Sequence, residues 1–365
     1  MRETLARMLD LEREGRRFVV ATVVRTHGST PQVVGARLIV DDRGGLTGTL
    51  GGGCVEGDAI SEARRVLVEG GASLRAYDLT EPLFWDTGLV CGGTMWIQIE
   101  PDRDVLGGAW ADGLRASLSD AASSAPAAFG TALRIDGRVV TAEGHRLIKD
   151  VAALTQTDGL TDRALGVLTE AFARGTPRLV SLAPDRELLV EPIVARPRLV
   201  IAGGGHVALA LAQMARLLDY AVTVVDDREE FANTDRFPGI EVFEGEIAST
   251  LAGLDPGWNT FIVVATRGHK LDAHCLRAAV ATRARYVGLL GSQRKTVLIA
   301  KMLRDEGVSE ERLRAVHAPI GLDLGGRTPA EIALSVLAEM SQERFGGSGR
   351  PLRLSEERFD KAVLR

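Results

Sequence analysis

The 365-residue chain has only three cysteines, which excludes a disulfide framework like those of small secreted proteins. No apolar run approaches the length that spans a bilayer, and none has the shape of a signal peptide. The net charge of −5 implies no general affinity for nucleic acid. We therefore expect a reduced, cytoplasmic protein without membrane or nucleic-acid partners, in which thiols stay available.

Several catalytic and metal-binding motifs are also missing. The sequence has no His-Glu-x-x-His and no paired Cys-x-x-Cys spacing, so a closed structural zinc site is not expected. It contains neither a nucleophile elbow nor a Walker loop. The hydrophobic fraction of 45% and the charged fraction of 25% are ordinary for a globular protein, and the length predicts two or three domains.

Two glycine–cysteine junctions are the most informative feature that is present. They read Gly51-Gly52-Gly53-Cys54-Val55-Glu56 and Cys91-Gly92-Gly93. Glycine permits positive φ and the close approach of a ligand, and cysteine thiolates suit soft metals and sulfur transfer. Both junctions can also be read as turns beside small hydrophobic side chains. We favour function because two of the three cysteines lie in these settings, with Cys91 and Cys54 as candidate ligands of a soft metal.

Glu56 bears on the reactivity of the first junction. If residues 54–56 are extended, the side chains of Cys54 and Glu56 share a face. The carboxylate would then raise the pKa of the thiol and oppose thiolate formation.

Residues 18–101 and 129–192 are predicted to be two copies of one α+β unit. Each copy has an amphipathic helix that ends at a glycine and a strand that ends in Glu-Pro. Segment 35–41 aligns with segment 144–150. Further positions align at identical spacing: Thr22, Arg25 and Gly28 with Thr131, Arg134 and Gly137.

The difference between the copies is informative. The second copy lacks the first junction and the insertion 80–94 that holds the second junction. The unit therefore forms its core without these motifs, and we expect them to serve chemistry. His145, in the second copy, is expected to be solvated.

The C-terminal half carries a dinucleotide-binding pattern. An apolar strand over 198–202 leads into Gly203-x-Gly205-His206-x-Ala208 and a helix, and the next strand ends at Asp226. The acid lies 18 residues beyond Ala208, near the spacing for a ribose hydroxyl contact. This order predicts a Rossmann-type fold, with these five residues as candidate ligand contacts. Glycines also serve tight helix–strand packing, so a bound nucleotide does not follow.

A second candidate phosphate site follows a later strand. Gly291 and Ser292 open a helix beside Arg294 and Lys295, where a phosphate would meet the helix N-terminus. A simple N-cap with a solvated basic pair explains the same residues. Cys275 lies in a helical stretch and is interpreted as filler.

Taken together, these segments resemble the XdhC/CoxI family of molybdenum-hydroxylase accessory proteins. The resemblance runs from about residue 18 to residue 343 and rests on these segments: Gly28–Pro31, Gly51–Glu56, Cys91–Gly93, Gly203–Ala208, Asp226–Arg228, Phe231–Asn233, Arg236–Pro238, Tyr286–Lys295, Ala318–Asp323 and Thr328–Glu331. It implies a protein that binds the molybdenum cofactor, supports its sulfuration together with a cysteine desulfurase, and delivers it to a client such as xanthine dehydrogenase. One departure is Thr266-Arg267-Gly268-His269, where Thr-His is expected, and this puts a role for that loop in doubt.

The sequence thus predicts an α/β protein with an N-terminal α+β region of two related units and a Rossmann-like C-terminal domain. The expected divisions are 1–105, 106–195, 196–343 and a tail over 344–365. The resemblance implies a homodimer that is an accessory factor rather than a catalyst. An NAD(P)-dependent oxidoreductase and a nucleotide-responsive regulatory module remain alternatives, because NAD(P) or another nucleotide would suit the glycine loop. The oxidoreductase explains the segment from Gly203 to Asp226 alone and leaves the two glycine–cysteine junctions unexplained.

Overall fold

The computed structural model describes residues 2–79, 92–108, 111–112, 115, 127–137, 139–148, 161–193 and 196–363. Cys91 and most of the expected insertion lie outside the described residues. The chain divides into two compact units, Met1–Ala195 and Arg196–Arg365.

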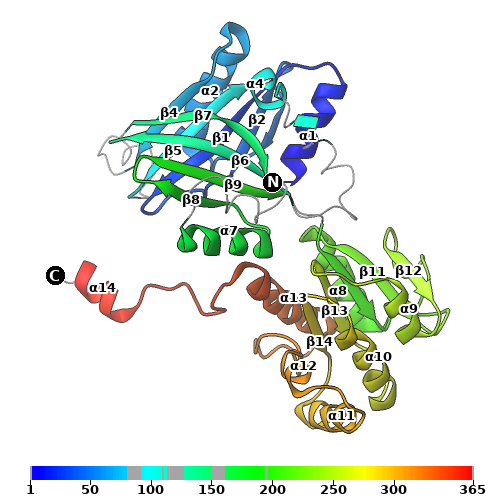
Figure 1. Cartoon of the computed structure of the whole chain (residues 1–365). Coiled ribbons are helices and arrows are strands. Elements are labelled where there is room, and N and C mark those ends of the chain that lie inside the picture. Colours follow the sequence, from blue (N-terminus) through cyan, green and yellow to red (C-terminus); the bar gives the residue numbers. More distant parts are fainter. Residues whose placement is uncertain are drawn as a thin grey trace. The chain divides into compact units, whose positions relative to one another are not determined.

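Two antiparallel sheets build the N-terminal unit (Figure 1). Sheet A has the strand order β3-β2-β1-β5-β4, and sheet B has the order β7-β6-β9-β8. The strands of sheet A are β1 (Phe18–His27), β2 (Arg37–Asp41), β3 (Leu46–Gly48), β4 (Ser73–Asp78) and β5 (Thr94–Pro101). Those of sheet B are β6 (Ala127–Asp136), β7 (Val139–Ile148), β8 (Arg178–Ala183) and β9 (Arg186–Ile193). The helices are α1 (Arg2–Arg13), α2 (Gly53–Glu69), α4 (Asp102–Leu106) and α7 (Asp162–Arg174).

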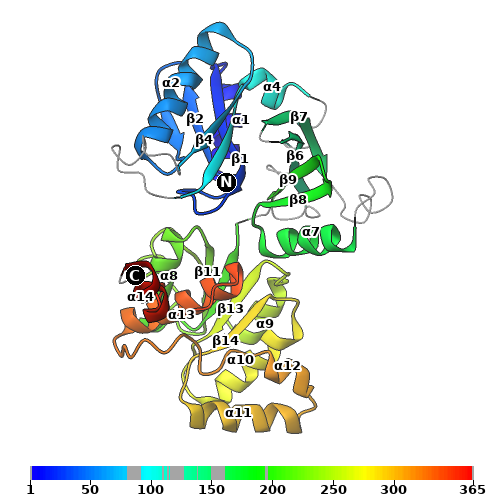
Figure 2. The ribbon, with the colours of Figure 1, turned by 90° about the vertical axis from the view of Figure 1, so that its left-hand side faces the viewer.

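Helix α2 covers the outer face of sheet A, as Figure 2 shows. Its residues Ala59, Ala63 and Val66 recur at helical spacing and join one buried cluster with residues of β1 and β5. A separate cluster combines Val24 and Trp96 of sheet A with Leu133, Val140 and Leu189 of sheet B. The inner faces of the two sheets therefore share a core.

The predicted repeat is confirmed by the strand order. The run β2-β1-β5-β4 of sheet A recurs as β7-β6-β9-β8 in sheet B. Both α2 and α7 end immediately before a glycine, Gly70 and Gly175 respectively.

The pairing register corrects the predicted alignment of segments 35–41 and 144–150 by one residue. Thr22 lies opposite Arg37, and Thr131 lies opposite His145. Arg37 therefore corresponds to His145 and not to Arg146. Strand β7 has a β-bulge at Glu143, and a bulge of this kind shifts the register without leaving a mark in the sequence pattern.

Two buried side-chain pairs cross between the copies at equivalent positions. The guanidinium of Arg37 donates to both carboxylate oxygens of Glu191, at 2.7 and 2.5 Å, and Glu191 is fully buried. In the reciprocal pair, Nε2 of His145 lies 3.0 and 3.1 Å from the carboxylate oxygens of Glu100. Burial raises the pKa of Glu191 despite the neighbouring Arg37.

The expectation that His145 is solvated is wrong. Only 6% of its side chain is exposed. Its Nδ1 lies 3.1 Å from the hydroxyl of Thr131, and its ring stacks on Phe129 at 4.9 Å between centroids. The histidine is held between the two copies because its Nε2 pairs with the carboxyl group of Glu100.

The C-terminal unit is a Rossmann-type domain, as predicted. Its sheet C is parallel throughout, with the order β12-β11-β10-β13-β14. The strands are β10 (Arg198–Ala202), β11 (Ala221–Asp226), β12 (Glu241–Glu244), β13 (Thr260–Val264) and β14 (Tyr286–Leu289). The helices are α8 (His206–Leu217), α9 (Ile247–Gly253), α10 (His269–Ala281), α11 (Gln293–Asp305), α12 (Glu310–Arg314), α13 (Pro329–Phe345) and α14 (Glu356–Val363).

Two buried clusters cover the two faces of sheet C. One includes residues of α8 and α13, and the other includes residues of α9, α10 and α11. The capping box of Thr328 and Glu331 at the start of α13 is present as the sequence indicates. The expected tail over 344–365 contains α14.

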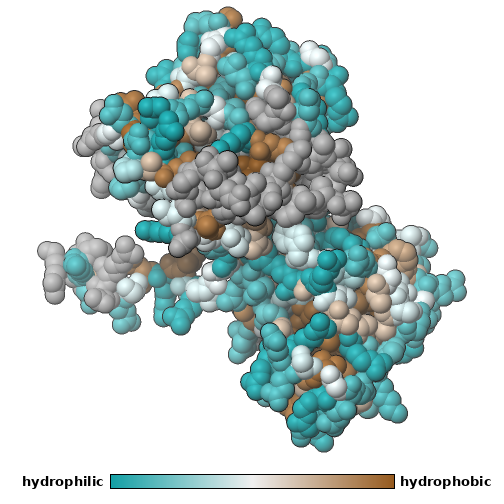
Figure 3. Space-filling view, in the orientation of Figure 1, coloured by the Kyte–Doolittle hydropathy of each residue, from teal (hydrophilic) through white to brown (hydrophobic). Residues whose placement is uncertain are grey.

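The surface seen in Figure 3 is mainly hydrophilic, with apolar side chains in small separate groups. Among the described residues, no helix combines the length and the apolar character needed to cross a membrane.

The ion pair of Arg37 with Glu191 gives a test of how the two copies are joined. Arg37→Met leaves the Glu191 carboxylate buried and unpaired, and we expect it to lower the free energy of unfolding by about 3–5 kcal/mol. The double variant Arg37→Met/Glu191→Leu removes both charges and should recover most of this loss. Urea-induced unfolding measures both variants. A double variant as unstable as the single variant would contradict the interpretation.

Candidate functional site

Three glycine-containing segments of the N-terminal unit meet at one end of sheet A. A Cβ on Gly28, which follows β1, would lie 3.1 Å from Cα of Gly93 and 3.2 Å from the carbonyl oxygen of Gly92. A Cβ on Gly51 would lie 2.8 Å from Cβ of Pro31. The turn over 28–31 is therefore packed against the first junction and against the glycines of the second.

The first junction is a run of left-handed backbone that ends in a helix. Gly51, Gly52 and Gly53 have φ values of 105°, 74° and 67°, which residues with a Cβ rarely adopt. Helix α2 starts at Gly53, so Cys54 lies in its first turn, where it is partly exposed. A Cβ on Gly52 would meet nothing within 4 Å. The backbone at Gly52 therefore faces open space.

Glu56 holds this glycine loop in place. Its carboxylate accepts hydrogen bonds from the Thr49 hydroxyl at 2.7 Å and from the backbone N–H groups of Leu50 and Gly52 at 2.6 and 3.2 Å. Partial burial alone would raise the pKa of Glu56, but these bonds lower it below the ordinary value. Because residues 54–56 are helical, Cys54 and Glu56 do not share a face as an extended segment would place them.

The glycine loop of the C-terminal unit divides into two kinds of position. A Cβ on Gly203 would lie 2.4 Å from the carbonyl oxygen of Ala265, and one on Gly204 would lie 2.2 Å from that of Phe231. The fold itself requires these two glycines. Gly205 has a φ of −66°, and a Cβ there would meet nothing within 4 Å. The space beside Gly205 is open, next to the N-terminus of α8.

The other predicted residues of this loop have different surroundings. His206 is exposed at the start of α8, whereas Ala208 is 1% exposed and belongs to the core cluster under that helix. Ala208 thus serves the close packing of helix and strand.

Asp226 is 1% exposed and already has several partners. Its carboxylate accepts from the N–H of Gly204 at 2.7 Å and from the guanidinium of Arg228 at 2.9 and 3.0 Å. Burial alone would raise the pKa of Asp226, but the bonds from Arg228 and Gly204 lower it. A ligand hydroxyl would have to replace Arg228 to reach this carboxylate.

Three arginines surround the loop and were not among the predicted site residues. Besides Arg228, Nε of Arg236 donates to the carbonyl oxygen of Gly204 at 3.0 Å. Arg267 makes two hydrogen bonds to Asp227, at 2.7 and 2.8 Å. Arg228 could have been found from the sequence, because it lies two residues after the candidate Asp226.

The second candidate phosphate site is tied to a buried acid. Ser292 caps α11 by accepting from the N–H of Lys295 at 3.3 Å. The ammonium of Lys295 pairs with the fully buried Asp272 and donates to the carbonyl oxygen of Leu290 at 3.1 Å. The hydroxyl of Thr266 also donates to Asp272, at 2.7 Å. Lys295 thus links the loop after β13 to the loop after β14.

The two cysteines that the structure describes, Cys54 and Cys275, have different surroundings. Cys275 is fully buried in a core cluster, and burial raises its pKa to about 12. Cys54 is partly exposed, and Cys91 directly precedes the described Gly92. Within the described ranges, no group of three or more His, Cys, Asp or Glu side chains could hold a metal ion.

Two family models match the chain. The XdhC and CoxI family model matches residues 11–78, and the XdhC Rossmann domain model matches residues 199–340. The first match ends within the N-terminal unit at β4, and the second covers sheet C and helices α8 to α12 with most of α13.

Two relatives match most of the chain, and a third matches part of it. A protein of Bacillus subtilis, named as a probable xanthine dehydrogenase subunit, is 25% identical over 347 residues, which cover 92% of this chain and 96% of that protein. The "Molybdenum cofactor insertion chaperone PaoD" of Escherichia coli is 27% identical over 331 residues, covering 91% and 85%. The "Uncharacterized protein YqeB" of Escherichia coli is 38% identical over 156 residues, which are 42% of this chain but only 28% of YqeB.

The fold has a counterpart among solved structures. A crystal structure from Bacillus halodurans, described as a xanthine dehydrogenase, matches with a TM-score of 0.71 at 20% identity and covers 97% of this chain and 98% of that chain. Its likeness extends over both units of the fold. The segments that the two family models match contain the first glycine junction and the glycine loop after β10. The chain belongs to the XdhC and CoxI family.

Proposed function

We propose that this protein is an accessory factor that binds the molybdenum cofactor, supports its sulfuration and delivers it to a molybdenum hydroxylase of the xanthine dehydrogenase kind. The names of two relatives that span most of the chain support the proposal. The observation that carries it is Gly205, whose φ of −66° suits any residue and whose backbone faces open space. Glycine is needed at such positions when a ligand lies against the backbone.

The cofactor is cargo, and its chemistry suits the residues present. It carries a phosphate, a pterin and a dithiolene-bound molybdenum atom. The N-terminus of α8 offers backbone N–H groups and a favourable dipole for a phosphate beside Gly205. Arg236, fixed to the carbonyl oxygen of Gly204, adds positive charge beside the same loop.

The N-terminal junction offers a thiol for molybdenum or for sulfur. Cys54 is partly exposed in the first turn of α2. The bonds from Thr49, Leu50 and Gly52 keep the Glu56 carboxylate engaged with the loop backbone. Cys54 or Cys91 would then contact molybdenum or carry sulfur for it.

Two partners complete the proposal. A cysteine desulfurase is proposed as the source of the sulfur. A homodimer is proposed as the assembly, and light scattering at micromolar concentration should give twice the chain mass of 39.0 kDa. A monomeric mass would count against this assembly.

Gly205→Val tests the loop of the C-terminal unit. The side chain meets no protein atom there, so the fold should persist while the ligand is blocked. We expect calorimetry to show at least a tenfold loss of affinity for the molybdenum cofactor or for a nucleotide, about 1.4 kcal/mol or more. Gly257→Val is the matched control, because a Cβ at Gly257 also meets nothing within 4 Å. Unchanged affinity in Gly205→Val would remove this loop from the proposal.

The thiols give a prediction about order. Cys91→Ala and Cys54→Ala should reduce cofactor retention or activation of the client, with Cys91→Ala the stronger of the two. Cys275→Ala is the control, because this thiol is fully buried in the core and has a raised pKa. Equal cofactor loading in all three variants, with sulfuration of the client intact, would show that the thiols take no part in the mechanism.

A further inference from the structure

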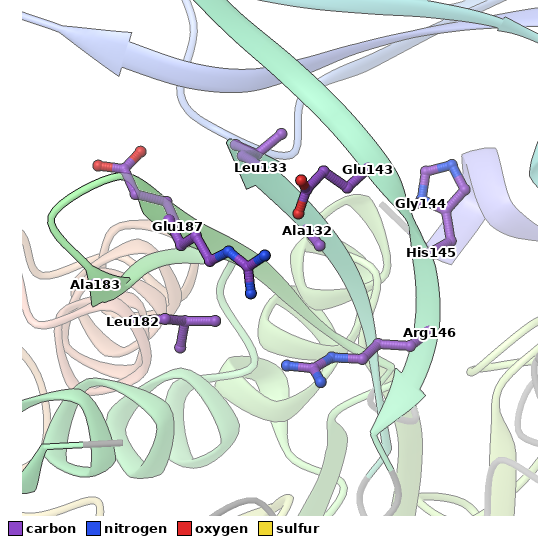
Figure 4. Close-up of a pocket in the computed structure, with 10 residues that line it drawn as sticks. Ala132, Leu133, Glu143, Gly144, His145, Arg146, Leu182, Ala183 and Glu187 are labelled. Carbon is purple, nitrogen blue, oxygen red and sulfur yellow. The ribbon is translucent and has the colours of Figure 1, made fainter. Parts of the chain in front are cut away.

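The acids that line a pocket of about 420 Å³ on sheet B already have partners within the chain. Glu143 pairs with Arg134 at 2.6 Å, and Glu187 pairs with Arg25 at 2.8 Å. Figure 4 shows the two acids on different strands of the pocket, Glu143 on β7 and Glu187 on β9. The negative charge of these two side chains is therefore balanced within the N-terminal unit.

An arginine beside the glycine loop of the C-terminal unit differs in this respect. Arg236 pairs with no acid in the described part of the chain, and its buried Nη2 has no hydrogen-bond partner there. Its Nε is held by the carbonyl oxygen of Gly204 at 3.0 Å. The carbon at the centre of its guanidinium lies 5.2 Å from the middle of the Phe231 ring. The positive charge of Arg236 is thus not balanced by contact with a described carboxylate.

A second arginine, Arg228, is held in one orientation on the same ring. Its Nε and Nη2 donate to the carboxylate of Asp226 at 2.9 and 3.0 Å, and its backbone N–H donates to the same carboxylate at 3.1 Å. The guanidinium carbon lies 3.7 Å from the middle of the Phe231 ring. The orientation of this cation is therefore set before a ligand arrives, which lowers the entropic cost of binding.

Asp226 uses only one of the two forks of N–H donors on this guanidinium. Nε and Nη2 form the fork that faces Asp226, whereas Nη1 and the second N–H of Nη2 form the other. Nη1 of Arg228 makes no hydrogen bond to a residue that the structure describes, and 27% of the side chain is exposed. The second fork can therefore receive an oxyanion from outside the protein.

This fork lies beside the proposed ligand position at Gly205. The carboxylate of Asp226 joins Arg228 to the N–H of Gly204, which it accepts at 2.7 Å. The segment from Arg228 to Phe231 packs directly on the loop, because a Cβ on Gly204 would lie 2.2 Å from the carbonyl oxygen of Phe231. Strands β10 and β11 are neighbours in sheet C, so the residues that follow them border the same crevice.

We propose that Arg228 makes this loop selective for a nucleotide that carries a second phosphate on its ribose, where the sequence predicted a hydroxyl contact of Asp226. The inference rests on the ligand position proposed beside Gly205 and concerns the group next to it. Asp226 is buried as the partner of Arg228 and Gly204, so the loop presents a cation there instead of a carboxylate. A ribose diol would have to displace Arg228, whereas a phosphate monoester would add charge-assisted hydrogen bonds to its second fork.

The test is calorimetry on the full chain at constant ionic strength. The probes are adenosine 2′,5′-bisphosphate, adenosine 5′-diphosphate and adenosine 5′-monophosphate. The first two are isomers that differ only in where the second phosphate lies, so they separate its position from the total charge. We expect the 2′,5′-bisphosphate to bind about tenfold more tightly than either of the others. Equal affinities of the two isomers, or no saturable binding of any probe, would overturn the proposal.

The paired variant Asp226→Asn/Arg228→Gln tests the arginine without leaving a buried charge unpaired. The two amides can bond to each other and to the N–H of Gly204, so thermal unfolding should show a folded protein. We expect the preference between the isomers to fall to about twofold or less. Arg283→Gln, at an exposed arginine that precedes β14 at the opposite end of the sheet, is the control and should keep the tenfold preference. A preference that persists in the paired variant would refute the role of Arg228.

Glu230 gives a variant with the opposite sign. The hydrogen bonds with Asp226, and the charges of Asp227 and Glu230, raise the pKa of Arg228. Glu230→Gln removes one of these negative charges and leaves the contacts of Arg228 in place. It should strengthen the binding of the 2′,5′-bisphosphate severalfold. Weaker binding in this variant would count against an oxyanion at Arg228.

Gly205→Val distinguishes a failure of this inference from a failure of the proposed ligand position. Loss of binding of all three probes in Gly205→Val, together with a preference for the 2′,5′-isomer in the unaltered chain, would support both. Loss of binding without that preference would keep the loop as the ligand site and refute the role of Arg228. Unchanged binding of every probe in Gly205→Val would refute the ligand position and this inference with it.

Discussion

The two reciprocal side-chain pairs between the N-terminal copies are the constraint on which this unit depends. Glu191 of the second copy is fully buried and pairs with Arg37 of the first, and Glu100 of the first copy pairs with His145 of the second. Each copy thus buries an acid that has its partner in the other copy. The pairs link β2 to β9 and β7 to β5 across the two sheets.

Glycines in this protein have two separate physical roles. At Gly203, Gly204 and Gly51 a side chain would collide with neighbouring protein atoms, so these glycines belong to the fold. At Gly205 and Gly52 the space is open, so the protein itself gives no steric reason for the absence of a side chain. The backbone conformation explains Gly52, which has a φ of 74°, but it does not explain Gly205 at −66°. Of these five glycines, Gly205 is therefore the one for which a ligand best accounts for the absence of a side chain.

The sequence predicted the elements well because their signals are local. The strand, glycine loop and helix over 198–217 form a parallel Rossmann unit as expected, and the repeat was visible from spacing alone. The partners of individual side chains were harder to predict from the sequence. The burial of His145 depends on Glu100, a residue far away in the sequence, and the bulge at Glu143 shifts the register without a sequence signal. The sequence did not predict that helix α2 starts at Gly53, because glycine is a poor helix former. In the structure, Glu56 stabilises the loop that precedes the helix.

The most direct test of the proposed function is co-purification of cargo. The protein is expressed in cells that make the molybdenum cofactor, purified, and assayed for bound molybdenum by mass spectrometry and for pterin by fluorescence after oxidation. Near-stoichiometric molybdenum and pterin, released together and able to activate a molybdenum hydroxylase that lacks its cofactor, is the result that the account predicts. Protein that carries neither, and that takes up no cofactor released from a donor enzyme, would contradict it.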